Sequence, residues 1–299
     1  QEGCNNFCTF CIIPWARGLL RSRKPEAVLE QAQKLVDAGY KEIVLTGIHT
    51  AGYGEDMKDY NFAQLLRDLE AKVNGINRLR ISSIEASQVT DEVVEVINNS
   101  SIVAPHLHIP LQSGSDSVLK RMRRKYSTSF YAEKIKQLKK ALPDFALTSD
   151  VIVGFPGETE EEFQETYNFI RDLKFSELHV FPYSQRTGTP AARMENQVPD
   201  DIKHERVRKL IALSNQLAKE YASKYENEVL EVIPEEPFKK DASTGEWVGY
   251  TDNYLKVRFP ATPDMEGKLV RVKITKAGYP FCQGQFERVR DEEKAKHVI

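Results

Sequence analysis

The chain has 299 residues, 40% of them hydrophobic and 29% charged, and its formal net charge at pH 7 is -2. This composition is that of an ordinary globular protein and excludes a disordered or fibrous chain. No apolar run reaches about 18 residues, so we expect no membrane span, and the near-neutral charge gives no general argument for nucleic-acid binding.

Cysteines are few and unevenly spread. Three of the four lie in the opening loop, at Cys4, Cys8 and Cys11, and the fourth is Cys282. A disulfide scaffold would spread paired cysteines along the chain. We therefore expect a protein of the reducing cytoplasm.

The opening loop has the spacing C-x3-C-x2-C, which lets three thiolates share one metal centre. Structural zinc uses four ligands, so Cys282 or a histidine would have to supply the fourth, and ferredoxin-type clusters use four cysteines at other spacings. A 4Fe-4S cluster held by three thiolates leaves one iron open, which the amino and carboxylate groups of S-adenosylmethionine (SAM) can chelate. The spacing favours this cluster over zinc or a group of reactive cysteines. The aromatic Phe10 before the last cysteine fits the same interpretation and is a candidate cofactor-binding residue.

Helical and strand-like segments alternate between residues 25 and 181, which is the pattern of a parallel β/α architecture. Five strands follow the cysteine loop, and one more strand before Gln1 would give the six of a partial (β/α)6 barrel. The site of such a barrel lies at the C-terminal ends of its strands. The expected strands are residues 41–46, 79–84, 106–111, 146–153 and 177–181, and the expected helices are residues 26–38, 62–73, 117–124, 130–142 and 159–173, with another helix from residue 90.

The pattern changes beyond Pro199. A long, charged amphipathic helix over residues 202–224 is expected to be a connector. After it, short β-branched runs separated by Gly, Pro and Asp turns predict a small antiparallel β-barrel. The chain is therefore divided into a β/α barrel at residues 1–200, a connecting helix at 201–225, an all-β barrel at 226–290 and a charged tail at 291–299.

The sequence resembles the radical SAM methylthiotransferases over nearly its whole length, and most of all their branch that acts on threonylcarbamoyladenosine in tRNA. The resemblance is carried by GCNNFCTFCIIPWARG with the following RSR, and by LTGIH, HIPLQSGSDSVLKRMRRKY, SDVIVGFPGETEEEF, FPYSQRTGTPA and GYTDNYLKV. It implies a radical SAM barrel followed by a TRAM-like domain. It also implies conversion of N6-threonylcarbamoyladenosine next to the anticodon to its 2-methylthio derivative. Residues 15–18 favour this branch over relatives that methylthiolate isopentenyladenosine in tRNA or an aspartate of a ribosomal protein.

Cofactors and partners follow from the same resemblance. It implies a 4Fe-4S cluster on Cys4, Cys8 and Cys11, bound SAM, an electron donor such as flavodoxin or ferredoxin, and the tRNA anticodon arm as partner. In the family, a second 4Fe-4S cluster supplies the sulfur and is bound by three cysteines of an N-terminal domain. Because Cys282 is the only further cysteine, we expect this chain to lack that domain.

Residues after two strands are candidates for SAM binding. Thr46 and Gly47 stand where radical SAM enzymes place a backbone motif for the SAM amino group, although Leu-Thr-Gly replaces the common Gly-Gly-Glu. A plain turn with an unusual φ at Gly47 would also explain this segment. Glu85 would place a carboxylate at the barrel mouth, where it could pair with the SAM ammonium or lie in solvent.

The resemblance assigns three further contacts with SAM. Gln112 and Arg124 are expected to reach its ribose and carboxylate, and Ile152 is expected against its adenine. Arg124 belongs to a basic run at residues 120–125, and a solvated helix face explains the rest of that run.

Other polar residues of the barrel are expected to be structural. Thr159 and Glu162 have the T-x-x-E spacing of a helix capping box. His106 and His108 share one face of a strand by the period of two. With no carboxylate partner visible in the sequence, both histidines are expected to be core or supporting residues rather than metal ligands.

The expected last domain is not basic, since residues 226–299 hold 12 Lys and Arg against 14 Asp and Glu. RNA binding would therefore depend on a few arranged side chains, for which Lys256, Arg258, Arg271 and Lys273 are the candidates. A domain that only packs on the barrel is the alternative.

Two other classes of function fit parts of the sequence. One is a radical SAM oxidoreductase of a small metabolite, with the last domain as a lid. The other is a non-catalytic RNA-binding module whose cysteines hold structural zinc. Iron and sulfide analysis separates the zinc protein from the others, and RNA binding under salt titration separates the metabolite enzyme.

Overall fold

The computed structural model describes residues 1–142, 144–239 and 245–290, and the chain divides into two compact units, Gln1–Leu217 and Ala218–Ile299. The charged tail expected at residues 291–299 lies outside the described residues.

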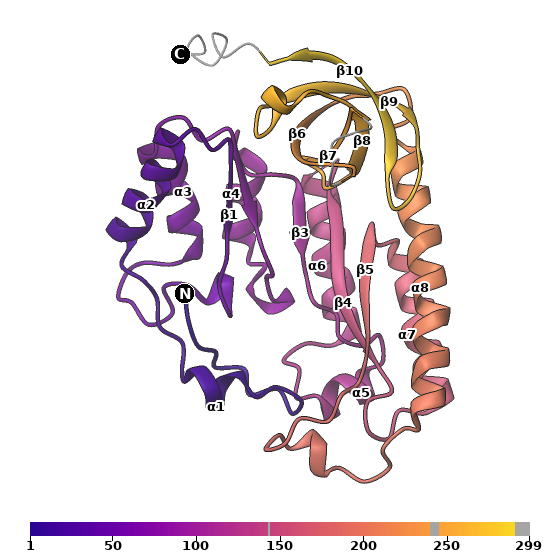
Figure 1. The fold of residues 1–299 in the computed structure, drawn as a ribbon. Coiled ribbons are helices and arrows are strands. Elements are labelled where there is room, and N and C mark those ends of the chain that lie inside the picture. Colours follow the sequence, from indigo (N-terminus) through magenta and orange to yellow (C-terminus); the bar gives the residue numbers. More distant parts are fainter. Residues whose placement is uncertain (143, 240–244, 291–299) are drawn as a thin grey trace. The chain divides into compact units, whose positions relative to one another are not determined.

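The first unit is built on five parallel strands, and the expected α/β class is confirmed (Figure 1). The first two strands pair with each other, and the other three form a sheet in sequence order. Parallel bridges from Leu79 to Val103 and from Ser83 to His108 link the two groups. The strands are β1 (Glu42–Leu45), β2 (Arg78–Ile81), β3 (His106–His108), β4 (Ala146–Val153) and β5 (Glu177–Pro182).

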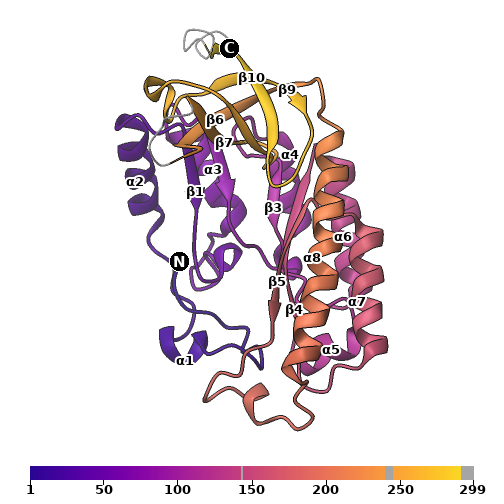
Figure 2. The same cartoon turned by 45° about the vertical axis from the view of Figure 1, so that its right-hand side comes forward.

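Helices join successive strands and cover the outer side of the sheet (Figures 1 and 2). Among the described residues, no helix has the length and apolar character needed to cross a membrane. A short helix after the cysteine loop, α1 (Ile13–Arg17), was not predicted, because five residues are too few to show a helical period. The other helices are α2 (Pro25–Asp37), α3 (Phe62–Lys72), α4 (Asp91–Asn99), α5 (Asp116–Arg121), α6 (Thr128–Ala141), α7 (Glu160–Leu173) and α8 (Asp200–Ser223).

The residues of β4 alternate between two environments. Leu147, Val151 and Val153 are at most 1% exposed and belong to the main hydrophobic core. Asp150 and Ile152 point to the opposite face and line a cavity. The period of two thus separates the side chains that hold the fold together from those available to a ligand.

The start of α7 has the capping box that the sequence predicts. The Thr159 hydroxyl accepts a hydrogen bond from the backbone N–H of Glu162 at 3.2 Å, and the Glu162 carboxylate accepts one from the N–H of Thr159 at 3.0 Å. Two of the N–H groups that a helix start leaves without partners are satisfied in this way.

A buried ion pair attaches α8 to the turn before α7. Arg206 Nη1 lies 2.7 Å from Glu158 Oε2, and the two side chains are 5% and 0% exposed. Arg206 also donates to the backbone carbonyl of Glu158 at 3.2 Å. Glu158 in turn accepts a hydrogen bond from the N–H of Gly154 at the end of β4.

The second unit is a closed barrel of five strands in the order β10-β8-β7-β6-β9. The expected all-β barrel is confirmed, but it is not wholly antiparallel, since β10 pairs parallel with β8. Five strands cannot alternate in direction around a closed ring, so one pair has to be parallel. The strands are β6 (Val229–Pro237), β7 (Glu246–Thr251), β8 (Lys256–Pro260), β9 (Val270–Lys276) and β10 (Cys282–Val289).

The turn between β7 and β8 is held by buried polar side chains. The Thr251 hydroxyl accepts a hydrogen bond from the N–H of Leu255 at 2.8 Å and contacts the Asn253 amide. The hydroxyl of Tyr221, at the end of α8, donates to the Asn253 carbonyl at 3.1 Å. The GYTDNYLKV segment therefore has a structural role within this unit.

We predict that Arg206→Met lowers the free energy of unfolding by about 3 to 5 kcal/mol, because it leaves the buried Glu158 carboxylate without its partner. The measurement is denaturant unfolding followed by circular dichroism. The matched control is Lys209→Met on the same helix, which breaks a half-exposed pair with Glu205 and should cost far less, because solvent screens that pair. Equal losses in the two variants would contradict a dominant role for the buried pair.

Candidate active site

The cysteine loop is fixed by backbone contacts on both sides of Cys8. The N–H of Cys11 donates to the Cys8 carbonyl at 3.0 Å and closes a tight turn. Thr9 bonds the end of α5 twice, from its N–H to the Met122 carbonyl at 3.1 Å and from its hydroxyl to the Arg121 carbonyl at 2.9 Å. These bonds place the loop beside the segment that follows β3.

Gly3 lets the start of the loop pass close to the backbone of Gly18 and Leu19. Its φ is +73°, and a Cβ at this position would lie 2.0 Å from the Leu19 carbonyl oxygen. No other residue type fits this approach, and the N–H of Cys4 bonds the Gly18 carbonyl at 3.2 Å as a result.

The thiols of the loop are partly withdrawn from water. Burial raises the pKa of Cys4, and the N–H of Asn6 opposes this only in part. Burial also raises the pKa of Cys8, against the opposing charge of Arg124. Thiols in this environment stay protonated until a metal displaces the protons.

The spacing of the cysteine sulfurs bears on the choice between zinc and a larger centre. Among the described residues, His108, Asp150 and His179 bring three donor atoms within 4.8 Å of one another, whereas the three cysteines form no such group. A tetrahedral zinc with Zn–S bonds of about 2.3 Å needs sulfurs about 3.8 Å apart. In this structure the three sulfurs do not form the compact group that a single tetrahedral zinc needs.

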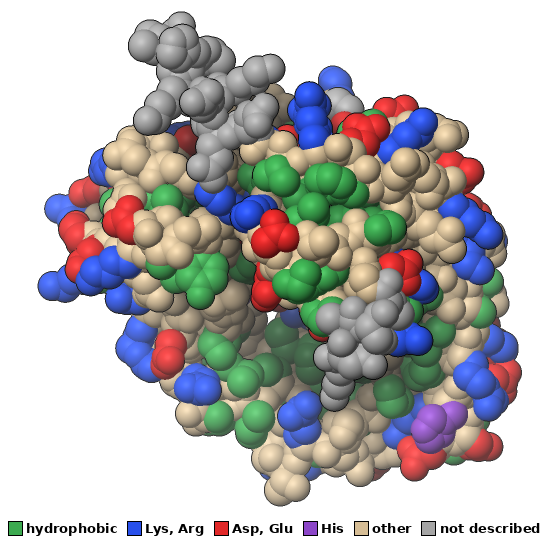
Figure 3. Space-filling model, turned by 45° about the horizontal axis from the view of Figure 1, so that its top comes forward, with side chains coloured by type: hydrophobic (Ala, Val, Ile, Leu, Met, Phe, Trp, Pro, Cys, Tyr) green, Lys and Arg blue, Asp and Glu red, His purple; other side chains and the backbone are tan. Residues whose placement is uncertain are grey.

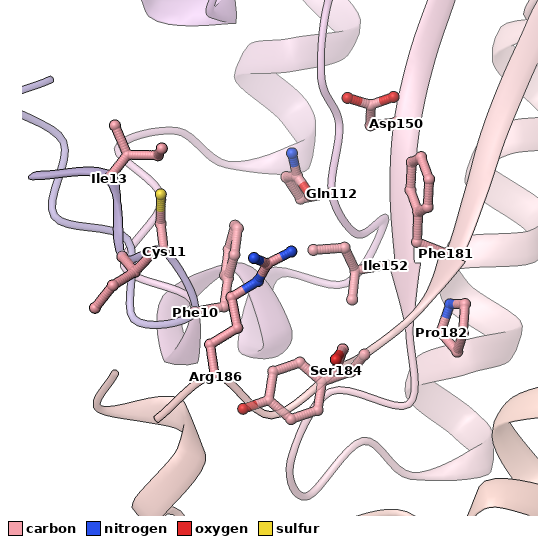
Figure 4. A pocket seen from close by; sticks show the side chains of 12 residues that line it. Phe10, Cys11, Ile13, Gln112, Asp150, Ile152, Phe181, Pro182, Ser184 and Arg186 are labelled. Carbon is pink, nitrogen blue, oxygen red and sulfur yellow. The ribbon is translucent and has the colours of Figure 1, made fainter. Parts of the chain in front are cut away.

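A cavity of about 470 Å³ opens beside the loop. It brings together Cys11 and three residues that the sequence assigns to SAM, namely Phe10, Gln112 and Ile152. In Figure 4, Phe10 and Cys11 come from one wall, and Gln112 and Ile152 come from the strand ends. The cavity is further lined by Ile12, Ile13, Asp150, Phe181, Pro182, Tyr183, Ser184 and Arg186.

Arg124 and Glu85 form a buried ion pair at the cysteine loop. Arg124 Nη2 bonds the Glu85 carboxylate, and the two side chains are 4% and 18% exposed. Arg124 Nη1 lies 3.3 Å from the sulfur of Cys8, and its Nε donates to the Tyr126 hydroxyl at 3.1 Å. Both residues therefore lie in the site and not in solvent, but neither lines the cavity beside Cys11.

Thr46 and Gly47 follow β1 and do not line this cavity. Gly47 has no positive φ, and a Cβ there would lie 2.9 Å from Gln1 Oε1. The Gln1 side chain also accepts the N–H of His49 at 2.7 Å. The unusual backbone conformation considered for Gly47 is therefore not present, and the space beside it is filled by the Gln1 side chain.

Asp150 supplies the carboxylate partner that the sequence did not reveal for His108. His108 Nε2 lies 3.2 Å from Asp150 Oδ2, and His179 Nδ1 lies 3.2 Å from Asp150 Oδ1. Thr148 joins the group on the far side, with its hydroxyl 3.0 Å from His108 Nδ1 and 2.9 Å from His106 Nε2. The core or supporting role expected of the two histidines stays a prediction, but its premise that no carboxylate partner is at hand is wrong for His108.

No motif in the sequence marks Asp150 or His179, because their strands meet only in the folded sheet. Asp150 lies two residues before Ile152 and so shares its face, which is the one signal that could have placed it near SAM. Although burial works against it, the bonds from His108 and His179 hold the pKa of Asp150 well below its usual range. The same bond with Asp150 raises the pKa of His179.

The four candidate RNA-binding residues lie on β8 and β9 of the second unit. Lys256 stands 5.1 Å from the ring centroid of Phe281, and Arg258 stands 3.8 Å from that of Phe238. Arg258 also pairs with Glu246, and Arg271 lies 3.9 Å from Glu231, whereas Lys273 forms no ion pair with the described residues. On the face drawn in Figure 3, basic and acidic side chains are interspersed, as the net charge suggests.

Comparison with known families decides the assignment. The family model of the radical SAM superfamily matches residues 1–170, and that of the TRAM domain matches residues 223–285. The chain belongs to the radical SAM superfamily. Its cysteine loop and cavity lie in the radical SAM region, and its closed barrel lies in the TRAM region.

Curated relatives cover the whole radical SAM and TRAM sequence. Threonylcarbamoyladenosine tRNA methylthiotransferase MtaB of Bacillus subtilis is 71% identical over 100% of this chain and 66% of that protein. A tRNA-2-methylthio-N(6)-dimethylallyladenosine synthase of Carboxydothermus hydrogenoformans is 41% identical over 94% of this chain and 64% of that protein. The chain thus spans slightly less than two thirds of the length of these relatives.

Solved structures support the radical SAM fold. The radical SAM methyltransferase TsrM of Kitasatospora setae superposes with a TM-score of 0.52 at 16% identity, over 64% of this chain and 37% of that one. Coproporphyrinogen III oxidase of Escherichia coli superposes with a TM-score of 0.53 at 18% identity, over 73% of this chain and 51% of that one. At these identities the likeness concerns the fold alone.

We predict that Asp150→Asn lowers the pKa of His179 toward its usual value, because the bond that raises it loses its charge. The folded wild-type ring holds more protons than the unfolded one, so its pair stabilises the fold at low pH and ceases to do so as the pH rises from about 6.5 through the raised pKa. Histidine ring signals followed by NMR during a pH titration give the shift directly. Asp172→Asn on the surface is the control. An unchanged pKa of His179 in Asp150→Asn would show that Asp150 does not raise it.

Proposed function

We propose that this chain forms the SAM-cleaving part of a tRNA methylthiotransferase that converts N6-threonylcarbamoyladenosine next to the anticodon to its 2-methylthio derivative. The main support is the 71% identity, along the whole chain, to a Bacillus subtilis protein named for this activity. A cysteine loop of the required spacing opens on a cavity in the same region.

Cys4, Cys8 and Cys11 would hold a 4Fe-4S cluster. The three side chains fit this role, because one short loop carries them, Cys11 lines the cavity, and the Arg124 guanidinium contacts the sulfur of Cys8. When bound, the cluster supplies the electron for reductive cleavage of SAM to methionine and a 5'-deoxyadenosyl radical. A nearby guanidinium stabilises thiolate charge and so favours ligand binding.

The cavity residues would bind and orient SAM. Phe10 and Ile152 offer apolar surface to a flat base, and the Gln112 amide can bond a ribose hydroxyl. Glu85 would meet the SAM ammonium and Arg124 would hold Glu85 in place through their ion pair. Thr46 and Gly47 would contribute backbone groups to the same amino end.

The second unit would bind the tRNA anticodon arm. Lys256 and Arg258 lie over aromatic rings, and aromatic side chains combined with cations suit stacking on unpaired bases. Arg271 and Lys273 would contact phosphates from β9. Since Arg258 and Arg271 already face glutamates, Lys256 and Lys273 would contribute most of the free charge.

Complete methylthiolation would require more than this chain. A second 4Fe-4S cluster, bound by three cysteines of a preceding domain, would supply the sulfur, and flavodoxin or ferredoxin would donate the electron. We place the enzyme in the cytoplasm, where its tRNA substrate and reduced thiols are found.

Isopentenyladenosine in tRNA is the second candidate substrate. It is supported by the relatives named as dimethylallyladenosine synthases, at 40 to 41% identity. The higher identity to the threonylcarbamoyladenosine enzyme favours the first candidate. A ribosomal protein or a small metabolite as substrate has no comparable support here.

We predict that anaerobic reconstitution gives one cluster of four irons per chain. Changing Cys4, Cys8 or Cys11 to Ala should abolish it, whereas Cys282→Ala should retain it, because Cys282 is 1% exposed inside the second unit. Iron and sulfide analysis with electron paramagnetic resonance of the reduced protein is the measurement. Loss of iron in Cys282→Ala alone would reject the three-cysteine site.

We predict that the reconstituted chain cleaves SAM to 5'-deoxyadenosine under strong reductant but adds no methylthio group to RNA. Cleavage needs one cluster, whereas sulfur donation needs three further thiolates that residues 1–299 do not provide. Chromatography of deoxyadenosine and mass spectrometry of an anticodon stem-loop RNA measure the two outcomes. Fusion to the N-terminal part of the Bacillus subtilis relative should restore transfer to threonylcarbamoyladenosine, and transfer by the unfused chain would refute the division.

A further inference from the structure

Two charged side chains line the cavity beside Cys11, Asp150 and Arg186. They differ in how well their charges are balanced. Both carboxylate oxygens of Asp150 are taken by the imidazoles of His108 and His179, each at 3.2 Å. Arg186 forms no ion pair with the described residues, and in Figure 4 its guanidinium extends toward the centre of the cavity, between Phe10 and Ile152.

The backbone of Arg186 is fixed although its side chain is exposed. Its carbonyl accepts hydrogen bonds from the N–H of Thr189 at 3.1 Å and from the Thr189 hydroxyl at 2.8 Å. The N–H of Ala191 then donates to the Thr9 carbonyl at 2.9 Å, which ties this segment to the cysteine loop. Thr189 and Ala191 are both 0% exposed. The guanidinium is therefore presented from a rigid base.

The other guanidinium near the cysteine loop is already engaged. Arg124 bonds Glu85, Tyr126 and the sulfur of Cys8, and it is 4% exposed. A carboxylate at Arg124 would compete with the Glu85 carboxylate for the same guanidinium. Arg186 can accept a carboxylate without such competition.

We propose that Arg186 is the carboxylate-binding residue of this cavity and takes the carboxylate of an amino-acid group. A planar guanidinium can bond both oxygens of a carboxylate at once. The apolar surfaces of Phe10, Ile152 and Phe181 surround it, and displacement of water from these surfaces by a ligand strengthens the attraction.

Two ligands present this chemistry. One is the methionine part of SAM, and the other is the threonine part of threonylcarbamoyladenosine, which rests on the proposed function. The two sources are separable because SAM binding can be measured without RNA, and RNA binding can be measured with and without the threonylcarbamoyl group.

The experiment uses the full reconstituted chain with Arg186→Ala and Arg186→Lys. The control is Arg193→Ala, an exposed arginine of the same segment that does not line the cavity. Equilibrium binding is measured for SAM and for two anticodon stem-loop RNAs, one with threonylcarbamoyladenosine and one with plain adenosine. Iron content verifies that each variant keeps the loop intact.

Loss of a bidentate charged contact should weaken binding about 10- to 100-fold in Arg186→Ala. Arg186→Lys should restore part of it, because lysine keeps the charge but not the paired geometry. A loss confined to SAM assigns the methionine carboxylate, and a loss of preference for the modified RNA at unchanged SAM affinity assigns the threonine carboxylate.

Unchanged affinity for all three ligands in Arg186→Ala would overturn the proposal, as would an equal loss in Arg193→Ala. A wild-type chain that binds both RNAs equally would count against the proposed substrate and remove the threonine source. The SAM measurement would then decide the role of Arg186 by itself.

Discussion

The attachment of the cysteine loop to the residues after α5 is the contact on which the rest of the site depends. Thr9 makes it with its backbone N–H and with its hydroxyl, and Thr9 is itself 2% exposed. This attachment positions two cysteines at once: the sulfur of Cys8 contacts Arg124, and Cys11 lines the cavity. A loop attached only by its cysteines would have to be ordered by the metal, and the entropy of ordering it would oppose metal binding.

The strands serve this arrangement by separating apolar from polar side chains. On β4, Leu147 and Val151 pack into the hydrophobic core. Thr148, Asp150 and Ile152 lie on the opposite face of the strand, where Asp150 and Ile152 line the cavity. Buried polar groups of this kind are tolerated only when they have partners. The chain of contacts from His106 through Thr148 and His108 to Asp150 and His179 provides such partners across three strands.

The sequence predicts the parts of this structure that depend on local patterns. The five strands of the first unit and the capping box at Thr159 follow a period or a motif. Gln112 and Ile152, which only the resemblance singles out, line the cavity beside Cys11. The sequence does not predict β10, whose run from Cys282 is polar and contains Gly284. That strand is fixed by closure of the barrel rather than by its own residues.

Side chains that meet across elements are also hidden from the sequence. The resemblance implies a place for Arg124 near SAM, but the bonds of Arg124 join it to Glu85, 39 residues away, and to Cys8, 116 residues away. The sequence does not single out Arg186, because an exposed arginine after a strand has no local signature. A functional side chain at the end of β5 becomes visible only when the cavity is present.

Charge balance links these separate contacts. Burial raises the pKa of Cys4 and Cys8, so their conversion to thiolate ligands releases protons and adds negative charge to the loop. Arg124 lies against that charge, but Glu85 already shares its guanidinium. A further anion such as a carboxylate would therefore find little compensation at Arg124, and Arg186, which lines the cavity and forms no ion pair with the described residues, is the group that can supply it. In the proposed site the two guanidiniums would have different roles: Arg124 would stabilise the thiolate of Cys8, and Arg186 would bind the carboxylate of the ligand.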